Sequence, residues 1–396
     1  MQTISTKQKQ VSYSGHTKTS VFSQWQKHLQ QQEYEICCHW MAEIDCSNWQ
    51  NILWDKITIY ASKHIHLHCP LLPALLCHHI YAFDIYVGKD PIHTVTQFRI
   101  NLCQIMGILC LSAKSPIATL PKVDSTKVDN SELIDTIHPY VIKCIHTGDD
   151  NPIVIRLLTT MFHHLDDTHY NSYNKVLYWL SVIIECDKYA IKQNMPFKMK
   201  LRSPNSKYNK TIYKSDVDKK YLNDWVWLMW DILCEMALHR VSVDGLQTLL
   251  SLRYLFAREY TTSKRTARIP LLIHAFLLLR AGKEIRNTGT IYSTDSIKKI
   301  VTLACNNINI MYDELQQANV HKNTNHFVNQ IIKEDSQNNN KKKEDANIVT
   351  KVLHTKTEPN NKTNRNNKTK NKISESSRDK WDTLAEIDEL FLGGKI

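Results

Sequence analysis

The sequence has few glycines and few prolines, and this scarcity narrows the folds open to it. It contains 9 glycines and 11 prolines in 396 residues, where average usage gives about 28 and about 20. Turn-rich β architectures and glycine-loop nucleotide sites depend on these two residue types. We therefore expect a chain built mostly from helices.

Catalytic and nucleotide-binding motifs are also missing. The patterns GxSxG, HExxH and GxGxxG do not occur. No GxxxxGK[ST] occurs either, because the three Gly-Lys pairs are followed by the wrong residues: Gly88 by Lys89-Asp90, Gly282 by Lys283-Glu284, and Gly394 by Lys395-Ile396. We expect no nucleotide hydrolysis, no cofactor and no enzymatic activity; an enzyme with an unrecognised constellation is the least favoured hypothesis.

Membrane spans and export signals have no counterpart in the sequence. No apolar run reaches the roughly 18 residues of a span, and the first twenty residues are polar with three lysines, unlike a secretory signal. The eleven cysteines are odd in number and lie on apolar helical faces. They favour reduced thiols over a disulfide framework. We expect no membrane partner and a cytoplasmic or nuclear compartment.

Helical periodicity is the main positive signal, and it is organised around the stretch from Gln30 to Pro73. Its apolar residues recur at helical spacing in two blocks that meet at Asn48. Similar spacing predicts further helices over 22–29, 74–87, 93–111, 131–146, 152–165, 170–191, 221–236, 243–260, 269–280 and 293–318. The sequence therefore predicts an all-α, multi-helix array of helical hairpins, with ten to twelve helices between residues 20 and 318.

Composition divides the chain into six parts. Thirteen asparagines fall in the 55 residues 321–375, which hold too little apolar surface to fold alone. The predicted parts are a disordered arm (1–20), an N-terminal helical domain (21–192), a basic loop (193–220), a C-terminal helical domain (221–318), a disordered Asn/Lys-rich linker (319–375) and a short amphipathic docking helix (376–396).

The formal net charge of +11 favours a polyanion as partner. Much of the excess lies in the arm and the linker, which leaves two basic groups in the helical part. The loop carries Lys207, Lys210 and Lys214 among tyrosines, a pattern typical of single-strand binding; an ordinary exposed insertion, with a short hairpin around 204–209, is the alternative. The second group lies at a helix junction and is the candidate for a folded phosphate-contacting patch; it comprises Arg258, Lys264, Arg265 and Arg268.

Histidines and cysteines gather at two places that invite a metal hypothesis. One group spans His64 to Cys69 and the other Cys77 to His79. Zinc needs four convergent ligands, and side chains two apart on a helix diverge. We therefore expect no metal site there.

The segment 376–396 is predicted to hold a short amphipathic helix. Ser376 and Asp379 have the spacing of a capping box. We expect this helix to dock into a groove of a protein partner; the alternative is that it folds back onto its own protein. Its partner-binding face comprises Trp381, Leu384, Ile387, Leu390 and Phe391, opposite an acidic face.

One stretch resembles a known family. WMAEIDCSNWQNILWDKITIYASKHIHLHCPLLPALL, from Trp40 to Leu76, is similar to the C-terminal helical oligomerisation region of clamp-loader-like AAA+ ATPases of the Werner-helicase-interacting-protein type. Ala61 and Ser62 match an Ala-Ser-Glu-Asp run in that family, whereas Lys63 and His64 replace its acids. SKRTARIPLLIHAFLLL looks like a piece of the stand-alone forms carried by large DNA viruses. The ATPase half has no counterpart.

The resemblance implies a non-enzymatic DNA replication or repair accessory scaffold that forms homo-oligomers, and the viral likeness implies a viral replication site as its location. Together with the basic groups, it predicts salt-dependent DNA binding of low sequence specificity, and a replication or repair protein captured by the C-terminal helix. The alternative is a structural or assembly protein that acts only through protein-protein contacts.

Overall fold

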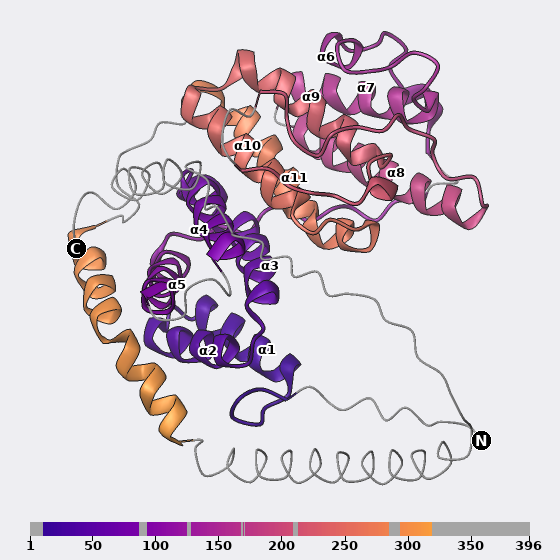
Figure 1. Ribbon diagram of the computed structural model, residues 1–396. Coiled ribbons are helices and arrows are strands. Elements are labelled where there is room, and N and C mark those ends of the chain that lie inside the picture. The colour runs from indigo at the N-terminus through magenta and orange to yellow at the C-terminus, as the bar shows by residue number, and fades with distance from the viewer. Residues whose placement is uncertain are drawn as a thin grey trace, which may run out of the picture.

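The computed structural model describes residues 11–86, 93–124, 128–167, 169, 171–208, 213–284 and 294–318. These ranges contain twelve α-helices and no strand; one isolated bridge joins Val11 and Thr17 (Figure 1). The all-α prediction and its helix number are confirmed. The helices are α1 (Lys18–Gln30), α2 (Tyr34–Cys46), α3 (Gln50–Tyr60), α4 (Leu72–Tyr86), α5 (His93–Leu111), α6 (Pro139–Ile142), α7 (Pro152–Asp166), α8 (Ser172–Lys192), α9 (Trp225–Arg240), α10 (Val243–Ala257), α11 (Thr262–Ala281) and a last helix over 295–318.

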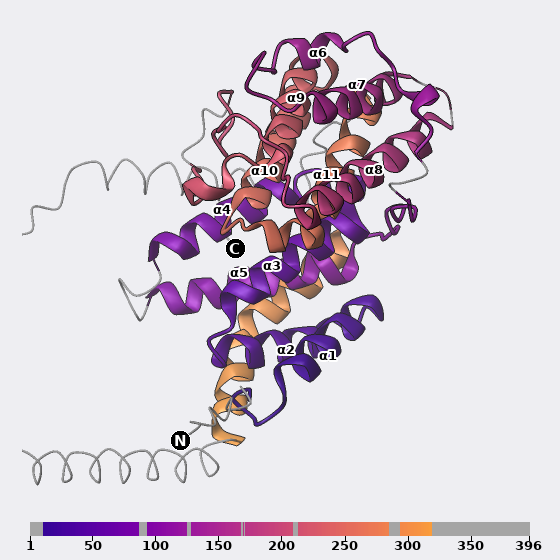
Figure 2. The same ribbon diagram turned by 90° about the vertical axis from the view of Figure 1, so that its right-hand side faces the viewer.

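The helices pack in two groups that interleave along the sequence. Helices α1 to α5 form one group and α6 to α11 the other, with α10 against α4 and α11 against α3 joining them. The 295–318 helix returns to the first group and lies beside α2 and α5 in both ribbon views (Figure 2). The packing thus crosses the boundary expected at 193–220, since α6 to α8 pack with helices from beyond it.

Caps and burial account for the best-predicted helices. Asn151 caps α7 by accepting from the Ile153 and Val154 N–H groups, and Pro152 occupies the first turn, where no partner for an N–H is needed. In α9, twelve of sixteen residues are buried, Trp225, Trp227 and Trp230 among them. A helix that is apolar on nearly every side belongs in the interior, so α9 forms the centre of its group rather than burying the single face that its spacing suggested.

Two helix boundaries differ from expectation. Residues 131–146 hold only a 3₁₀ turn and the four-residue α6, because Pro139 lacks an N–H and restrains the residue before it to extended backbone. Conversely, α11 begins at Thr262 and runs through Pro270, whereas the apolar spacing predicts a start near Ile269. Its first turns are capped by Thr261 and carry Arg265 and Arg268, which are buried. Their ion pairs, described below, stabilise these turns.

No described helix combines the length and the apolar content needed to cross a bilayer.

Candidate nucleic-acid interface

The three arginines of the predicted helix-junction patch lie inside the protein. Arg258, Arg265 and Arg268 are 7%, 8% and 3% exposed. Arg258 ends α10 and donates from Nη2 and Nε to Asp84 of α4, over 2.8 and 3.0 Å. Arg268 donates from Nη2 to Asp55 of α3 over 2.9 Å. Both guanidinium groups therefore connect the two helical groups instead of facing solvent.

Arg265 forms the most deeply buried of these ion pairs. Its guanidinium donates to Asp224 over 2.7 Å and to Asp187, and both carboxylates are almost fully buried. Burial raises the pKa of Asp187, while the charge of Arg265 lowers it. Tyr260 completes the site by donating its hydroxyl to Asp224 over 2.6 Å. Both terminal nitrogens of the guanidinium are therefore engaged by internal carboxylates rather than facing solvent.

Lys264 is the member of the junction group with the most exposed side chain, at 35%. Its Nζ lies 3.1 Å from Asp55 and 3.2 Å from Glu259. The four residues thus come together as predicted, but as an internal ion-pair network. The acidic residues of α3, α4 and α8 and the N-cap of α9 were the sequence signal for it: Asp55, Asp84, Asp187 and Asp224. No partner could be assigned to them before folding.

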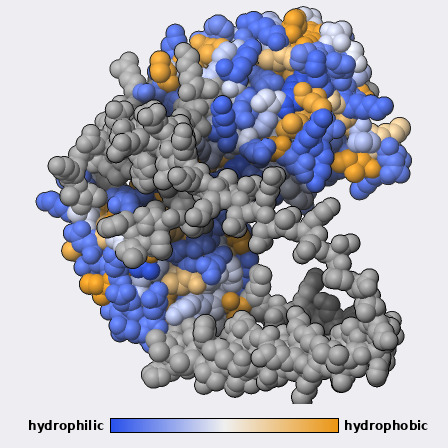
Figure 3. Space-filling view, in the orientation of Figure 1, coloured by the Kyte–Doolittle hydropathy of each residue, from blue (hydrophilic) through white to orange (hydrophobic). Residues whose placement is uncertain are grey.

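The basic loop behaves differently from the junction group. From Lys192 to Lys220 the sequence holds nine Lys/Arg and two Asp/Glu. The side chains of Lys200, Lys207 and Lys220 are 43%, 70% and 63% exposed. Lys198, Lys214 and Lys219 are exposed as well, whereas Lys210 lies outside the described residues. The surface of the α6–α11 group is mostly hydrophilic in the view of Figure 3.

Buried arginines hold the first half of this segment against the helices. Arg202 donates to both carboxylate oxygens of Asp150, over 2.8 and 2.6 Å. Arg253 of α10 donates to the carbonyl oxygens of Ser203 and Pro204, each over 2.9 Å. Loop carbonyls that leave water need such partners. Arg202 and Arg253 therefore hold the segment against the helices, and the described lysines of the segment remain exposed.

The second half is tied back to the first. Asn205 donates from Nδ2 to the Ser215 carbonyl over 2.9 Å and accepts the Ser215 N–H over 2.8 Å. Tyr213 packs edge-on against Tyr81, with ring centroids 5.2 Å apart. No strand occurs among the described residues of the segment, and residues 209–212, where the alternative hairpin would continue, lie outside them.

Lys207 borders a hollow of 370 Å³ at the base of the segment. Glu235 lies between two lysines, 3.5 Å from Lys143 Nζ and 3.6 Å from Lys207 Nζ. The Tyr208 hydroxyl donates to Glu235 and lowers the pKa of that carboxyl. Asp231 also lines the hollow, but it pairs with the buried Arg202 and Arg253. The two lysines at the rim therefore share Glu235 and carry more charge than it neutralises.

Two further features of the sequence are the histidine and cysteine groups and the segment 376–396. In the ranges that the structure covers, no three His, Cys, Asp or Glu side chains are placed to hold a metal ion. His66 and His68 instead contact the carbonyl and hydroxyl oxygens of Ser115, at 2.7 and 3.1 Å. The predicted partner-binding residues lie outside the described ranges: Trp381, Leu384, Ile387, Leu390 and Phe391.

Comparison of the chain with family models, with curated proteins and with solved structures gave no match. The resemblance to clamp-loader-like proteins therefore stays a prediction.

Proposed function

We propose that this protein is a non-enzymatic scaffold that binds nucleic acid through the lysines of residues 192–220. The observation that carries the proposal is the contrast within this segment: Arg202 is buried and paired, while the lysines around it are exposed. Lysines that neutralise phosphates release counterions, which gives salt-dependent binding without base recognition. A role in DNA replication or repair rests on the resemblance of Trp40–Leu76 alone.

The chemistry of the segment favours backbone contacts over sequence reading. Lysine presents a compact charge on a flexible stem, whereas specific base contacts use the planar fork of arginine. Lys207 lies over the Tyr208 ring, 4.8 Å from its centroid, so a cation and an aromatic face occur together beside the hollow. Such pairs suit single strands, whose bases can stack.

The test is a fluorescence-anisotropy titration of single- and double-stranded DNA at several salt concentrations. The variant carries glutamine at four exposed lysines of the segment: Lys198, Lys207, Lys214 and Lys219. The slope of log K against log salt should become shallower by about 0.7 to 0.9 for each phosphate that a lysine no longer neutralises. An unchanged slope would overturn the proposal.

A matched variant separates a local surface from net charge. It carries glutamine at four exposed lysines elsewhere, Lys27, Lys56, Lys63 and Lys122, and changes the net charge by the same amount. Binding should stay close to that of the parent protein. An equal loss in both variants would assign the affinity to overall charge and contradict the proposal.

A second candidate function is assembly through protein contacts alone. Exposed apolar side chains on the 295–318 helix favour it, among them Leu303 at 64% and Ile310 at 56% exposure. Absence of DNA binding at low salt, together with capture of a protein by this surface, would favour this alternative.

A further inference from the structure

The 295–318 helix packs through only one of its faces. Val301, Cys305 and Tyr312 are at most 4% exposed, and Tyr312 donates its hydroxyl to Asp45 of α2 over 2.7 Å. The approach to α5 is close, since a Cβ placed at Gly107 would lie 2.5 Å from a Val301 methyl group. This face belongs to the core of the first helical group.

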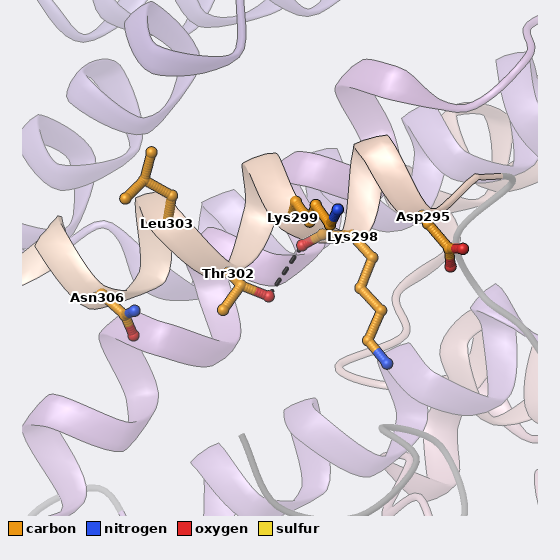
Figure 4. A pocket seen from close by; sticks show the side chains of 6 residues that line it. All are labelled: Asp295, Lys298, Lys299, Thr302, Leu303 and Asn306. Carbon is orange, nitrogen blue, oxygen red and sulfur yellow. Dashed lines mark hydrogen bonds between the residues drawn. The ribbon is translucent and has the colours of Figure 1, made fainter.

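The opposite face exposes apolar side chains to solvent. Ile300, Leu303 and Ile310 are 50%, 64% and 56% exposed, and spacings of three and seven residues place them on one side of the helix. A hollow of 430 Å³ lies along its first turns (Figure 4). The lining residues come from successive turns: Asp295, Lys298, Lys299, Thr302, Leu303 and Asn306.

We propose that residues 379–392 of the same chain dock on this exposed face. The segment has a matching apolar stripe, which comprises Trp381, Leu384, Ile387, Leu390 and Phe391. An amphipathic segment of about fourteen residues is marginal alone in water. Burial of its stripe against a helix face that is itself apolar stabilises both partners.

Charge sets the direction of docking. The face carries Lys298 and Lys299 near its start, and exposed Asp313 and Glu314 near its end. The early part of the segment holds Asp379, Lys380 and Asp382, and its late part holds acidic charges alone: Glu386, Asp388 and Glu389. An antiparallel arrangement therefore places the more acidic end of the segment beside the two lysines, whereas a parallel one places that end beside Asp313 and Glu314. Asp295 is the one carboxylate beside the lysines, and it leaves that end with a net positive charge.

The connection is long enough and starts at the right place. Sixty residues separate Ala318 from Asp379, and a flexible chain of that length spans roughly 43 Å. Leu303 lies fifteen residues before Ala318, or roughly 22 Å along the helix. Tethering of this kind gives an effective concentration on the order of 1 mM. An intrinsic Kd of about 0.1 mM would then keep about nine-tenths of the molecules docked.

Docking in this way buries the apolar stripe of residues 379–392, which a protein partner would otherwise contact. A partner in trans must displace the 295–318 helix before it can bind Trp381 and Phe391. Docking on the same chain therefore competes with binding of a partner.

The test is hydrogen exchange followed by mass spectrometry on the full chain. Amides of residues 379–392 should exchange about tenfold more slowly than in a synthetic peptide of the same sequence, as the occupancy above implies. The double variant Leu303→Asp with Ile310→Asp should restore the fast exchange of the free peptide. Both side chains are exposed, so these changes leave the helix folded, which the melting temperature will verify.

A control variant places the same charges elsewhere. Ile153→Asp with Val243→Asp alters side chains that are 54% and 85% exposed on α7 and α10, and it should leave the protection intact. Absence of protection in the parent chain would overturn the proposal, and so would protection that survives in the Leu303 and Ile310 variant. Protection that rises with protein concentration would replace docking in the same chain by docking on a second copy.

Discussion

Two basic groups that look alike in the sequence have opposite fates in the fold. The junction group from Arg258 to Arg268 turns inward onto carboxylates of α3, α4, α8 and α9. The segment from Lys192 to Lys220 keeps its described lysines in water, and Arg202 is the buried one among its described basic residues. The difference follows the chemistry of the cations, because arginine satisfies planar carboxylates when buried and lysine is costly to dehydrate. Charge counts alone therefore do not locate a polyanion surface.

The largest expected effect comes from Arg265. Arg265→Met leaves Asp187 and Asp224 buried without their cation, and the loss of one partner of a buried pair costs about 3–5 kcal/mol. The free energy of unfolding, measured by urea denaturation, should fall by that amount. A loss below about 1 kcal/mol would mean that the site is solvated and open to ligands after all.

The free energy of unfolding should depend on pH through His274, a buried histidine without an acidic partner. His274 is 1% exposed, and burial, with a smaller contribution from the charge of His66, lowers its pKa to about 3. The unfolded chain binds a proton near pH 6.5 that the folded chain refuses, so stability is full above pH 6.5 and falls as the pH drops toward 3. The slope is at most about 1.4 kcal/mol per pH unit.

The variant His274→Gln should lose that part of the acid sensitivity. Urea denaturation of both proteins between pH 7 and 4.5 measures it, and parallel curves for the two would contradict the assignment. Arg265 offers the contrast, since its charge persists throughout this range.

A smaller effect is expected at Arg258. Arg258→Met removes the pair with Asp84, but Asp84 is 37% exposed and water replaces part of the lost interaction. We expect a loss of about 1–2 kcal/mol, between the values for buried and for surface pairs. The same denaturation assay measures it, and an effect as large as that of Arg265→Met would show that burial does not rank these pairs.

The smallest effect on stability is expected at the lysines of the segment. Lys207→Gln and Lys214→Gln should change the free energy of unfolding by no more than about 0.5 kcal/mol, because both side chains are exposed. DNA affinity, measured by anisotropy, should nevertheless fall. Unfolding of either lysine variant would contradict the contrast between the two basic groups. Loss of DNA binding in Arg258→Met alone would contradict it as well.

The sequence by itself determined the helical class and most helix positions. The stripe over 93–111 became α5, and the helix predicted over 152–165 became α7, which begins at Pro152. These features depend on the spacing of apolar residues and on contacts between residues a few positions apart, so the sequence alone indicates them. The basic character of residues 193–220 was equally visible.

Only the tertiary structure decided which cations are free. Asp55 and Arg268 stand 213 residues apart and Asp84 and Arg258 stand 174 apart, so no local pattern could pair them. The return of the 295–318 helix to α2 and α5 was hidden for the same reason. Packing brings side chains together that are distant in the sequence, and in a dehydrated interior a cation pairs with the nearest carboxylate.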